Sequence, residues 1–310
     1  MNVSVVIPLY NKAATLERAL SSALGQAYAP AEILVIDDGS TDGGGARVQS
    51  VADPRVRLIR QTNGGVSAAR NRGVHEAQSD WVAFLDADDE WLPGFLDQLC
   101  SAARQDPDVG TVFSNMRLSN SNTAWLGGQR GGRLDNYFDF FVAHQGHGMS
   151  SSSTLVKRRL LQQVGGFPQG VTHGEDLDTW ARLAWEAPVA YVAEVLAIYH
   201  VTGSPRAMDV SHTVIAAGLQ RCLRSARDRL RQHRVSPSLR RATRSYAQML
   251  ALMVARELKD AGDGRGAFES VLEAFPPAAS ARDIHFYATA LVRSLCPAGL
   301  LAIQRRCRQT

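Results

Sequence analysis

The sequence has few cysteines and no long apolar run, and each absence argues against a class of protein. Its 310 residues contain four cysteines, which are far apart and form no C-x-x-C pair. A disulfide framework or a zinc site is therefore not expected. No run of about 18 apolar residues could cross a membrane, and Met1-Asn2 leads without a basic flank into an apolar segment. We therefore expect a cytoplasmic protein.

Acidic residues are scarce in the last third of the chain, although the net charge of the whole is only +4. Residues 205–310 contain 18 lysines and arginines against 8 acids, which leaves 16 basic and 22 acidic residues in the first 204. This asymmetry favours two domains, 1–204 and 205–310. The basic part would suit an anionic membrane surface, at the inner membrane face, or a charged acceptor glycan. The alternative is that its arginines only solvate helix surfaces.

The first 115 residues alternate between strand-like and helix-like segments. Short apolar runs rich in β-branched residues predict strands, and leucines at four-residue spacing predict a helix around 16–24. This alternation predicts a mostly parallel sheet flanked by helices, in which ligands bind beyond the carboxyl ends of the strands. Beyond residue 205 the pattern is helical throughout. The expected strands are 3–7, 33–36, 56–59, 81–85, 109–113, 154–156 and 189–201, and the later helices are 66–77, 175–186, 211–234, 238–260, 266–274 and 280–295.

The most informative segment is 82–90, where four apolar residues run into Asp86, Asp88, Asp89 and Glu90. A buried strand that ends in clustered carboxylates places negative charges at one sheet edge, where their repulsion is unfavourable without a cation. Oxygen ligands favour Mg²⁺ or Mn²⁺ over zinc. A metal ion held there would in turn bind an anionic group such as a diphosphate. The alternative is a solvated acidic turn.

Two further acidic segments are each open to two interpretations. The segment 37–42 is typical of a turn and helix cap, but one of its carboxylates could also accept hydrogen bonds from a base or a ribose. Glu175 and Asp176 open a predicted helix, which is typical of N-terminal capping. The glycine-containing segment before them could instead deliver a carboxylate into a cleft as a general base. His200, near the end of a strand, would by default be a packed or solvent-facing side chain.

Together these segments resemble the family 2 glycosyltransferases, which use nucleotide sugars and have the GT-A fold. The resemblance covers about the first 204 residues and includes an N-x-G-x-x-x-A-R-N-x-G match at 63–73 and a D-x-D strand end. The matching segments are 3–11, 32–42, 63–73, 84–88, 165–167 and 174–180.

The resemblance implies a GT-A-like α/β fold, with a mostly parallel sheet flanked by helices and a Rossmann-like nucleotide-binding half, followed by an all-helical C-terminal region. It also implies a metal-dependent, inverting hexosyltransferase-type enzyme of bacterial cell-surface glycan or glycoconjugate synthesis. Asp176 would be the general base, and Glu175 would help to position the acceptor. The nucleotide-sugar pocket would be lined by Pro8, Tyr10, Asp38, Asn63, Arg70, Asp86 and Ala87.

The implied cofactor is Mn²⁺ or Mg²⁺, held by Asp88 and Asp86. Many relatives complete the metal shell with the histidine of a Y-R-x-H pattern, but here Tyr199-His200-Val201-Thr202 places histidine two positions early. Either His200 takes over this role, or a water completes the shell, or metal binding is weaker.

The implied donor is a UDP-, GDP- or dTDP-linked sugar, and the acceptor is a glycan, a lipid-linked glycan or a protein. Loops 125–133 and 144–153 are expected to determine the donor sugar. We expect no nucleic-acid partner, and a homodimer is a further option.

Two alternative functions stay open. A sugar-nucleotide pyrophosphorylase would need a glycine-rich basic loop where Pro8-Leu9-Tyr10-Asn11-Lys12 stands. A non-catalytic interaction protein would work through residues 205–310.

Overall fold

The computed structural model describes residues 1–127, 130–201, 210–232 and 235–274. The chain divides into two compact units, Met1–Arg206 and Ala207–Thr310, which we describe separately. The predicted helix 280–295 lies outside the described residues.

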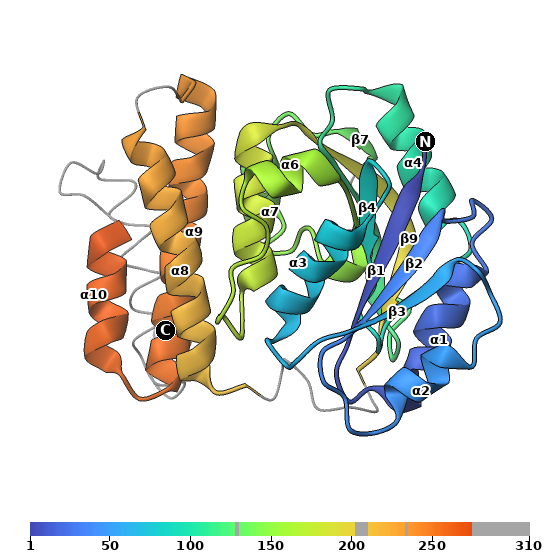
Figure 1. The fold of residues 1–310 in the computed structure, drawn as a ribbon. Helices are drawn as coiled ribbons and strands as arrows, with labels where there is room; N and C mark the ends of the chain where they lie inside the picture. Colours follow the sequence, from blue (N-terminus) through green and yellow to red (C-terminus); the bar gives the residue numbers. More distant parts are fainter. Residues whose placement is uncertain (128–129, 202–209, 233–234, 275–310) are drawn as a thin grey trace. The chain divides into compact units, whose positions relative to one another are not determined.

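The first unit is built around a mixed sheet with helices on both faces (Figure 1). Its described strands follow the order β3-β2-β1-β4-β8-β6-β9-β5, and β7 pairs with β9. The β1–β2, β2–β3, β1–β4 and β6–β9 pairs are parallel, whereas β8 runs antiparallel between β4 and β6. The strands are β1 (Val3–Leu9), β2 (Glu32–Asp37), β3 (Val56–Arg60), β4 (Trp81–Phe84), β5 (Glu90–Trp91), β6 (Thr111–Leu118), β7 (Gly132–Arg133), β8 (Thr154–Lys157) and β9 (Val189–Tyr199).

The helices of this unit lie between the strands in sequence, which confirms the predicted α/β class with a GT-A-like sheet. They are α1 (Ala13–Leu24), α2 (Gly44–Gln49), α3 (Val66–Glu76), α4 (Phe95–Gln105), α5 (Tyr137–Ala143), α6 (Arg158–Gln163) and α7 (Glu175–Glu186), with a short 3₁₀ turn, η1, at Ser151–Ser153.

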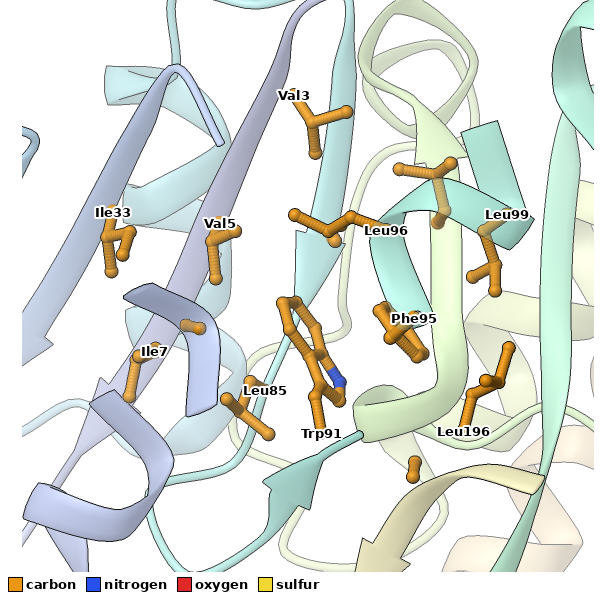
Figure 2. Packing of buried hydrophobic residues seen from close by; sticks show 14 of the residues in the cluster. Val3, Val5, Ile7, Ile33, Leu85, Trp91, Phe95, Leu96, Leu99 and Leu196 are labelled. Atoms are coloured by element: carbon orange, nitrogen blue, oxygen red, sulfur yellow. The ribbon is translucent and has the colours of Figure 1, made fainter. Parts of the chain in front are cut away.

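Successive side chains of β1 point to opposite faces of the sheet, because a strand has a two-residue period. Val3, Val5 and Ile7 belong to a buried cluster that includes residues of α1 and α4, such as Phe95 (Figure 2). On the other face, Val6 lies so near Gly73 of α3 that a Cβ there would be 2.3 Å from its Cγ1. The glycine lets α3 pack closely, with its first turn near the carboxyl ends of β1 and β2.

The second unit contains three described helices, α8 (His212–Arg231), α9 (Pro237–Asp260) and α10 (Gly264–Ala274), so the predicted helical character of this region is confirmed. α9 packs against both neighbours. Ser236 caps it by accepting a hydrogen bond from the Leu239 N–H at 3.3 Å, and Pro237 occupies its first position. No helix among the described residues is both long and apolar enough to span a membrane.

Candidate functional site

Asp38 follows β2, and its carboxylate shapes the turn before α3. Its Oδ1 accepts hydrogen bonds from Gln61 Nε2 (2.8 Å) and the Gly64 N–H (2.9 Å), and its Oδ2 accepts one from the Gly65 N–H (2.8 Å). The residue is only 2% exposed. Asp38 and Asn63, both predicted to line a nucleotide pocket, therefore share one corner of the sheet edge.

The end of β1 is joined to the same corner. Asn11 has a positive φ of 50°, its N–H donates to Ser40 Oγ (3.2 Å), and its Oδ1 accepts from the Thr41 N–H (2.8 Å). Pro8 pairs with Ile36 of β2, and the Tyr10 side chain is exposed beside this junction. These contacts gather Pro8, Tyr10, Asp38 and Asn63 along one edge, which is the edge where ligands bind in parallel sheets.

Arg70 of α3 connects two acidic segments that are far apart in sequence. Its Nη1 donates to Glu175 Oε1 (2.9 Å) and its Nη2 to Asp86 Oδ1 (2.8 Å), while the guanidinium lies over the Phe167 ring. The side chain is 4% exposed. Burial alone would lower the Arg70 pKa, but the nearby carboxylates outweigh it and raise that pKa above its usual value. Arg70 is therefore a fixed cation between the end of β4 and the start of α7.

Asp176 lies beside this bridge at the start of α7. Burial and the negative charge of Glu175 raise the pKa of Asp176 to about 7, although Arg70 acts in the opposite direction. Its Oδ1 accepts a hydrogen bond from the Leu177 N–H at 2.7 Å. A carboxylate whose pKa lies near neutrality is suited to accept and release a proton.

The loop before α7 is clamped to α3, which sets the position of Glu175 and Asp176. Asn71 Nδ2 donates to the Phe167 carbonyl (2.7 Å), and the Phe167 N–H donates to Asn71 Oδ1 (2.8 Å). The Phe167 ring packs edge-on against Phe84 and Trp180 at centroid distances of 5.2 and 5.5 Å. This clamp explains the glycine at position 166, since a Cβ there would lie 2.5 Å from Asn71 Oδ1.

Two basic side chains, Lys12 just before α1 and Arg18 within it, contact the acidic turn after β4. Lys12 Nζ lies 2.7 Å from Asp88 Oδ2, and Arg18 Nη2 donates to the Asp88 carbonyl oxygen at 2.6 Å. Both side chains of the Lys12–Asp88 pair are 20% exposed. One partner of Asp88 is thus a basic side chain from the junction of β1 and α1. Ala87 is buried in the core cluster between the two aspartates.

Asp89, by contrast, is buried beneath the turn. It accepts hydrogen bonds from Ser152 Oγ (2.6 Å) and from the His200 N–H (3.3 Å), and it is 2% exposed. Burial raises the Asp89 pKa well above its usual range, and the charge of Asp86 acts in the same direction. Ser152 of η1 also accepts a hydrogen bond from the Asp86 N–H (3.1 Å). Asp89 is therefore a structural link between the β4 turn and the end of β9.

His200 directs its ring to Glu90, with Nε2 2.9 Å from Oε2, while its backbone bonds Asp89. The structure therefore brings His200 to the acidic turn. No group of three or more metal-ligating side chains is placed around one point in the described part of the chain. Thr202, at the position where relatives carry histidine, lies outside the described residues.

A family model described as "Glycosyl transferase family 2" matches residues 4–165. The chain belongs to this family. The MT1568 protein of Mycobacterium tuberculosis is 30% identical over 229 residues, which is 68% of this chain and 70% of that protein. The Escherichia coli glucosyltransferase WfgD, named for transfer from UDP-Glc to α-D-GlcNAc-diphosphoundecaprenol, is 33% identical over 122 residues, 39% of this chain and 48% of that one.

Two solved structures share the fold. TarS 1–349 of S. aureus, solved with UDP-GlcNAc, superposes with a TM-score of 0.73 at 16% identity, covering 95% of this chain and 89% of TarS 1–349. The mannosyltransferase PcManGT of Pyrobaculum calidifontis, solved with GDP-Man and Mn²⁺, gives a TM-score of 0.61 at 22% identity, covering 95% and 81%. This family 2 chain therefore has the fold of nucleotide-sugar-dependent glycosyltransferases.

Sequence reasoning did not single out Lys12, Ser152 or Asn71 as members of this site. Lys12 contacts Asp88 across 76 residues of sequence, and Ser152 contacts Asp89 across 63. Asn71 lies in the motif segment 63–73, and its partner Phe167 lies in the motif segment 165–167. The sequence does not indicate that these two segments bind each other.

Proposed function

We propose that this chain moves a sugar from a nucleotide-diphosphate donor to an acceptor hydroxyl with inversion at the anomeric carbon. The observation that carries the proposal is the pair of hydrogen bonds that the Arg70 guanidinium donates to Asp86 and Glu175. This contact supports the proposal because Asp176, the predicted base, follows Glu175, and Asp86 follows the strand predicted to end at the donor diphosphate. An inverting displacement requires a base on the acceptor side and an anion-binding site on the leaving-group side.

In the proposed reaction, Asp176 takes the proton of the acceptor hydroxyl as its oxygen attacks the anomeric carbon. The bond from that carbon to the diphosphate oxygen breaks at the same time. Glu175, held by Arg70, lines the acceptor side next to Asp176. The pKa of Asp176 near 7 supports this role, because the group can accept the proton and later release it.

Mn²⁺ or Mg²⁺ belongs to this proposal. Asp88 and Asp86 offer the oxygen ligands that such ions prefer, and the solved PcManGT complex contains Mn²⁺. Asp86 and Asp88 would hold the ion: besides burial, the charges of both raise the pKa of the neighbouring Asp89, so a cation would relieve the repulsion at this turn. A bound ion would neutralise the departing diphosphate. Lys12, already paired with Asp88, adds positive charge at the same place.

The donor and acceptor classes follow from the relatives only by analogy. The solved neighbours hold UDP-GlcNAc, UDP and GDP-Man, and WfgD is named for a lipid-linked acceptor. We propose a UDP- or GDP-linked hexose as donor and a cell-surface glycan precursor as acceptor. Contact of the arginine-rich helices α8 and α9 with an anionic membrane, from the cytoplasmic side, is part of the proposal.

The test is a binding and turnover screen of the purified chain. Calorimetry with UDP, GDP and dTDP, each with and without Mn²⁺, should reveal one preferred nucleotide whose affinity rises with the ion. The matching sugar nucleotide should be hydrolysed slowly without an acceptor. Asp176→Asn should keep the binding and lose turnover with an acceptor. If no nucleotide binds under any condition, the proposed function is wrong.

A further inference from the structure

Three aromatic side chains from separate segments meet near the acidic turn. The Trp125 ring lies 5.9 Å from the His147 ring at 75°, and 5.9 Å from the Tyr199 ring at 40°, between ring centroids. Trp125 and Tyr199 are partly buried against the core cluster, and His147 is exposed. We call these three residues the aromatic platform.

The platform stands at the carboxyl ends of β6 and β9. Tyr199 ends β9 and pairs with Leu118 at the end of β6, and the Trp125 N–H donates to the Met116 carbonyl at 2.9 Å. The residue after Tyr199 is His200, whose backbone bonds Asp89. The platform therefore borders the turn that carries Asp86 and Asp88.

The distance between the aromatic platform and the predicted nucleotide-binding residues indicates which part of the substrates the platform could bind. Nucleotide-binding residues are predicted on β1, β2 and the end of β4, and β6 lies two strands beyond β4, with β9 next to it. At about 4.8 Å per strand, β6 is roughly 10 Å and β9 roughly 14 Å from β4. A span of this size would accommodate linked sugar residues, and an acceptor that extends from Asp86 and Asp88 along the sheet edge toward β9 would reach the platform.

The alternative is that these three rings have only a packing role in the core. Nearby aromatic side chains with such a role, such as Phe113 and Tyr191, are at most 1% exposed. The platform rings instead keep accessible surface. Among the described residues, no hydrogen-bond acceptor is found for the Trp125 indole N–H. A ring face beside a free polar edge suits a sugar, whose pyranose ring presents one face of C–H groups and a rim of hydroxyls.

We infer that the aromatic platform binds a pyranose ring of the acceptor, so that the acceptor of the proposed transfer is itself a saccharide. This inference rests on the proposed function, which takes a glycan precursor as acceptor, and adds the subsite that would bind it. Trp125 and Tyr199 would stack on the sugar, and His147, held by Nδ1 3.0 Å from the His144 carbonyl oxygen, would orient Trp125.

The experiment uses the intact chain and methyl glycosides of glucose, galactose, N-acetylglucosamine and rhamnose as probes. Saturation-transfer NMR detects weak saccharide binding without any turnover, so its result is independent of the donor reaction. The wild type should transfer saturation to at least one glycoside, and Trp125→Ala should lose this transfer. With the same glycoside as acceptor, Trp125→Ala should raise the acceptor KM roughly ten-fold. Donor KM and slow donor hydrolysis should not change. A raised donor KM would return Trp125 to the donor-selecting role expected for loop 125–133 and would overturn the inference.

Trp125→Phe keeps a ring and should retain most of the binding, which separates stacking from a folding defect. Trp185→Phe changes a tryptophan that stacks on Phe138 inside the core, and it should leave saccharide binding unchanged. The inference is overturned if the wild type binds none of the glycosides, or if Trp125→Ala binds them as the wild type does. If the chain binds a saccharide but no donor nucleotide, the proposed function is wrong, whereas the saccharide site at the aromatic platform is supported.

Discussion

Arg70 and Glu175 are 105 residues apart in sequence and form a buried ion pair at 2.9 Å. The same guanidinium holds Asp86, so α3, the end of β4 and the start of α7 are fixed to one cation. The reacting groups of the proposed enzyme thus depend on one side chain for their mutual position.

Arg70→Lys should therefore impair catalysis more than donor binding. A lysine ammonium cannot reproduce two parallel donors to two carboxylates, so Glu175 or Asp86 would lose its partner. We expect a loss of about 1–3 kcal/mol in the free energy of unfolding, the cost of one buried group left without its hydrogen bond, and a kcat lowered at least ten-fold. Urea unfolding and steady-state kinetics measure both quantities. Arg72→Lys is the matched control, because Arg72 lies on the same helix and pairs with Glu76 at the surface. A fall in donor affinity with normal kcat would place Arg70 in the nucleotide pocket instead.

The role of Asp176 predicts a pH dependence. A general base must be deprotonated, and the pKa of Asp176 is raised to about 7, so kcat should rise with pH through this value and then level off. Asp176→Asn should lower kcat by about 10²- to 10⁴-fold and keep donor affinity. Asp178→Asn, which breaks the pair with Arg182 one turn inside α7, should reduce stability and leave the shape of the pH profile unchanged. Normal turnover of Asp176→Asn would remove Asp176 from this role.

Much of the first unit could be predicted from the sequence because its patterns are local. Apolar runs such as Val3–Leu9 have the composition of buried strands, and the acids that follow β2 and β4 must share an edge once the strands are parallel. The antiparallel position of β8 between β4 and β6 could not be predicted, since the pattern of a buried strand is the same in both directions. The sequence predicts a strand at 154–156 but does not indicate its partners.

The partners of the site residues were also beyond the sequence. Arg70 stands in a motif whose resemblance implies a nucleotide pocket, yet two of its nitrogens bind Asp86 and Glu175. Asp38 was weighed as a turn residue or a nucleotide ligand, and its carboxylate holds the turn that contains Asn63. Neither contact excludes a ligand. Both contacts arise from the way in which the strands and α3 pack, and the spacing of residues along the sequence does not predict that packing.

The Lys12–Asp88 pair predicts opposite effects of two substitutions on metal binding. Asp88→Asn removes a charged oxygen ligand and should abolish Mn²⁺ binding, as followed by water-proton relaxation. Lys12→Met removes the cation that competes for Asp88 Oδ2 at 2.7 Å, and it should tighten Mn²⁺ binding several-fold in the absence of nucleotide. Arg47→Met, at the end of the neighbouring α2, controls for the loss of one positive charge. Equal Mn²⁺ affinity in the wild type and Asp88→Asn would contradict the proposed metal site.

The clamp before α7 can be tested with two neighbouring glycines. Gly165 and Gly166 both have positive φ, 85° and 65°, so alanine at either position costs about 1–2 kcal/mol of backbone strain. A Cβ on Gly165 would meet nothing within 4 Å, whereas one on Gly166 would lie 2.5 Å from Asn71 Oδ1. Gly166→Ala should therefore cost roughly 1–3 kcal/mol more than Gly165→Ala, because it also breaks the Asn71–Phe167 bonds. Equal losses in urea unfolding would show that the clamp contributes little.

The helical unit offers a test of membrane contact. Residues 211–256 contain ten arginines and one acid, Asp228. Arg240 donates to the Leu230 and Gln232 carbonyls, so the end of α8 lies beside the start of α9. Its exposed arginines include Arg224, Arg231, Arg241 and Arg244, which lie in the halves of α8 and α9 nearest the connection between them.

Each arginine near an anionic leaflet contributes about 1 kcal/mol, so replacing these four by alanine should weaken binding to phosphatidylglycerol-containing vesicles by at least ten-fold. Binding should fall as salt rises, because exposed charges are screened, and should be absent on pure phosphatidylcholine. Arg265→Ala, an exposed arginine of α10 that pairs with Glu269, is the control and should bind as the wild type does. Co-sedimentation measures all of these variants. Binding that is indifferent to lipid charge would leave the arginines as a solvated helix surface.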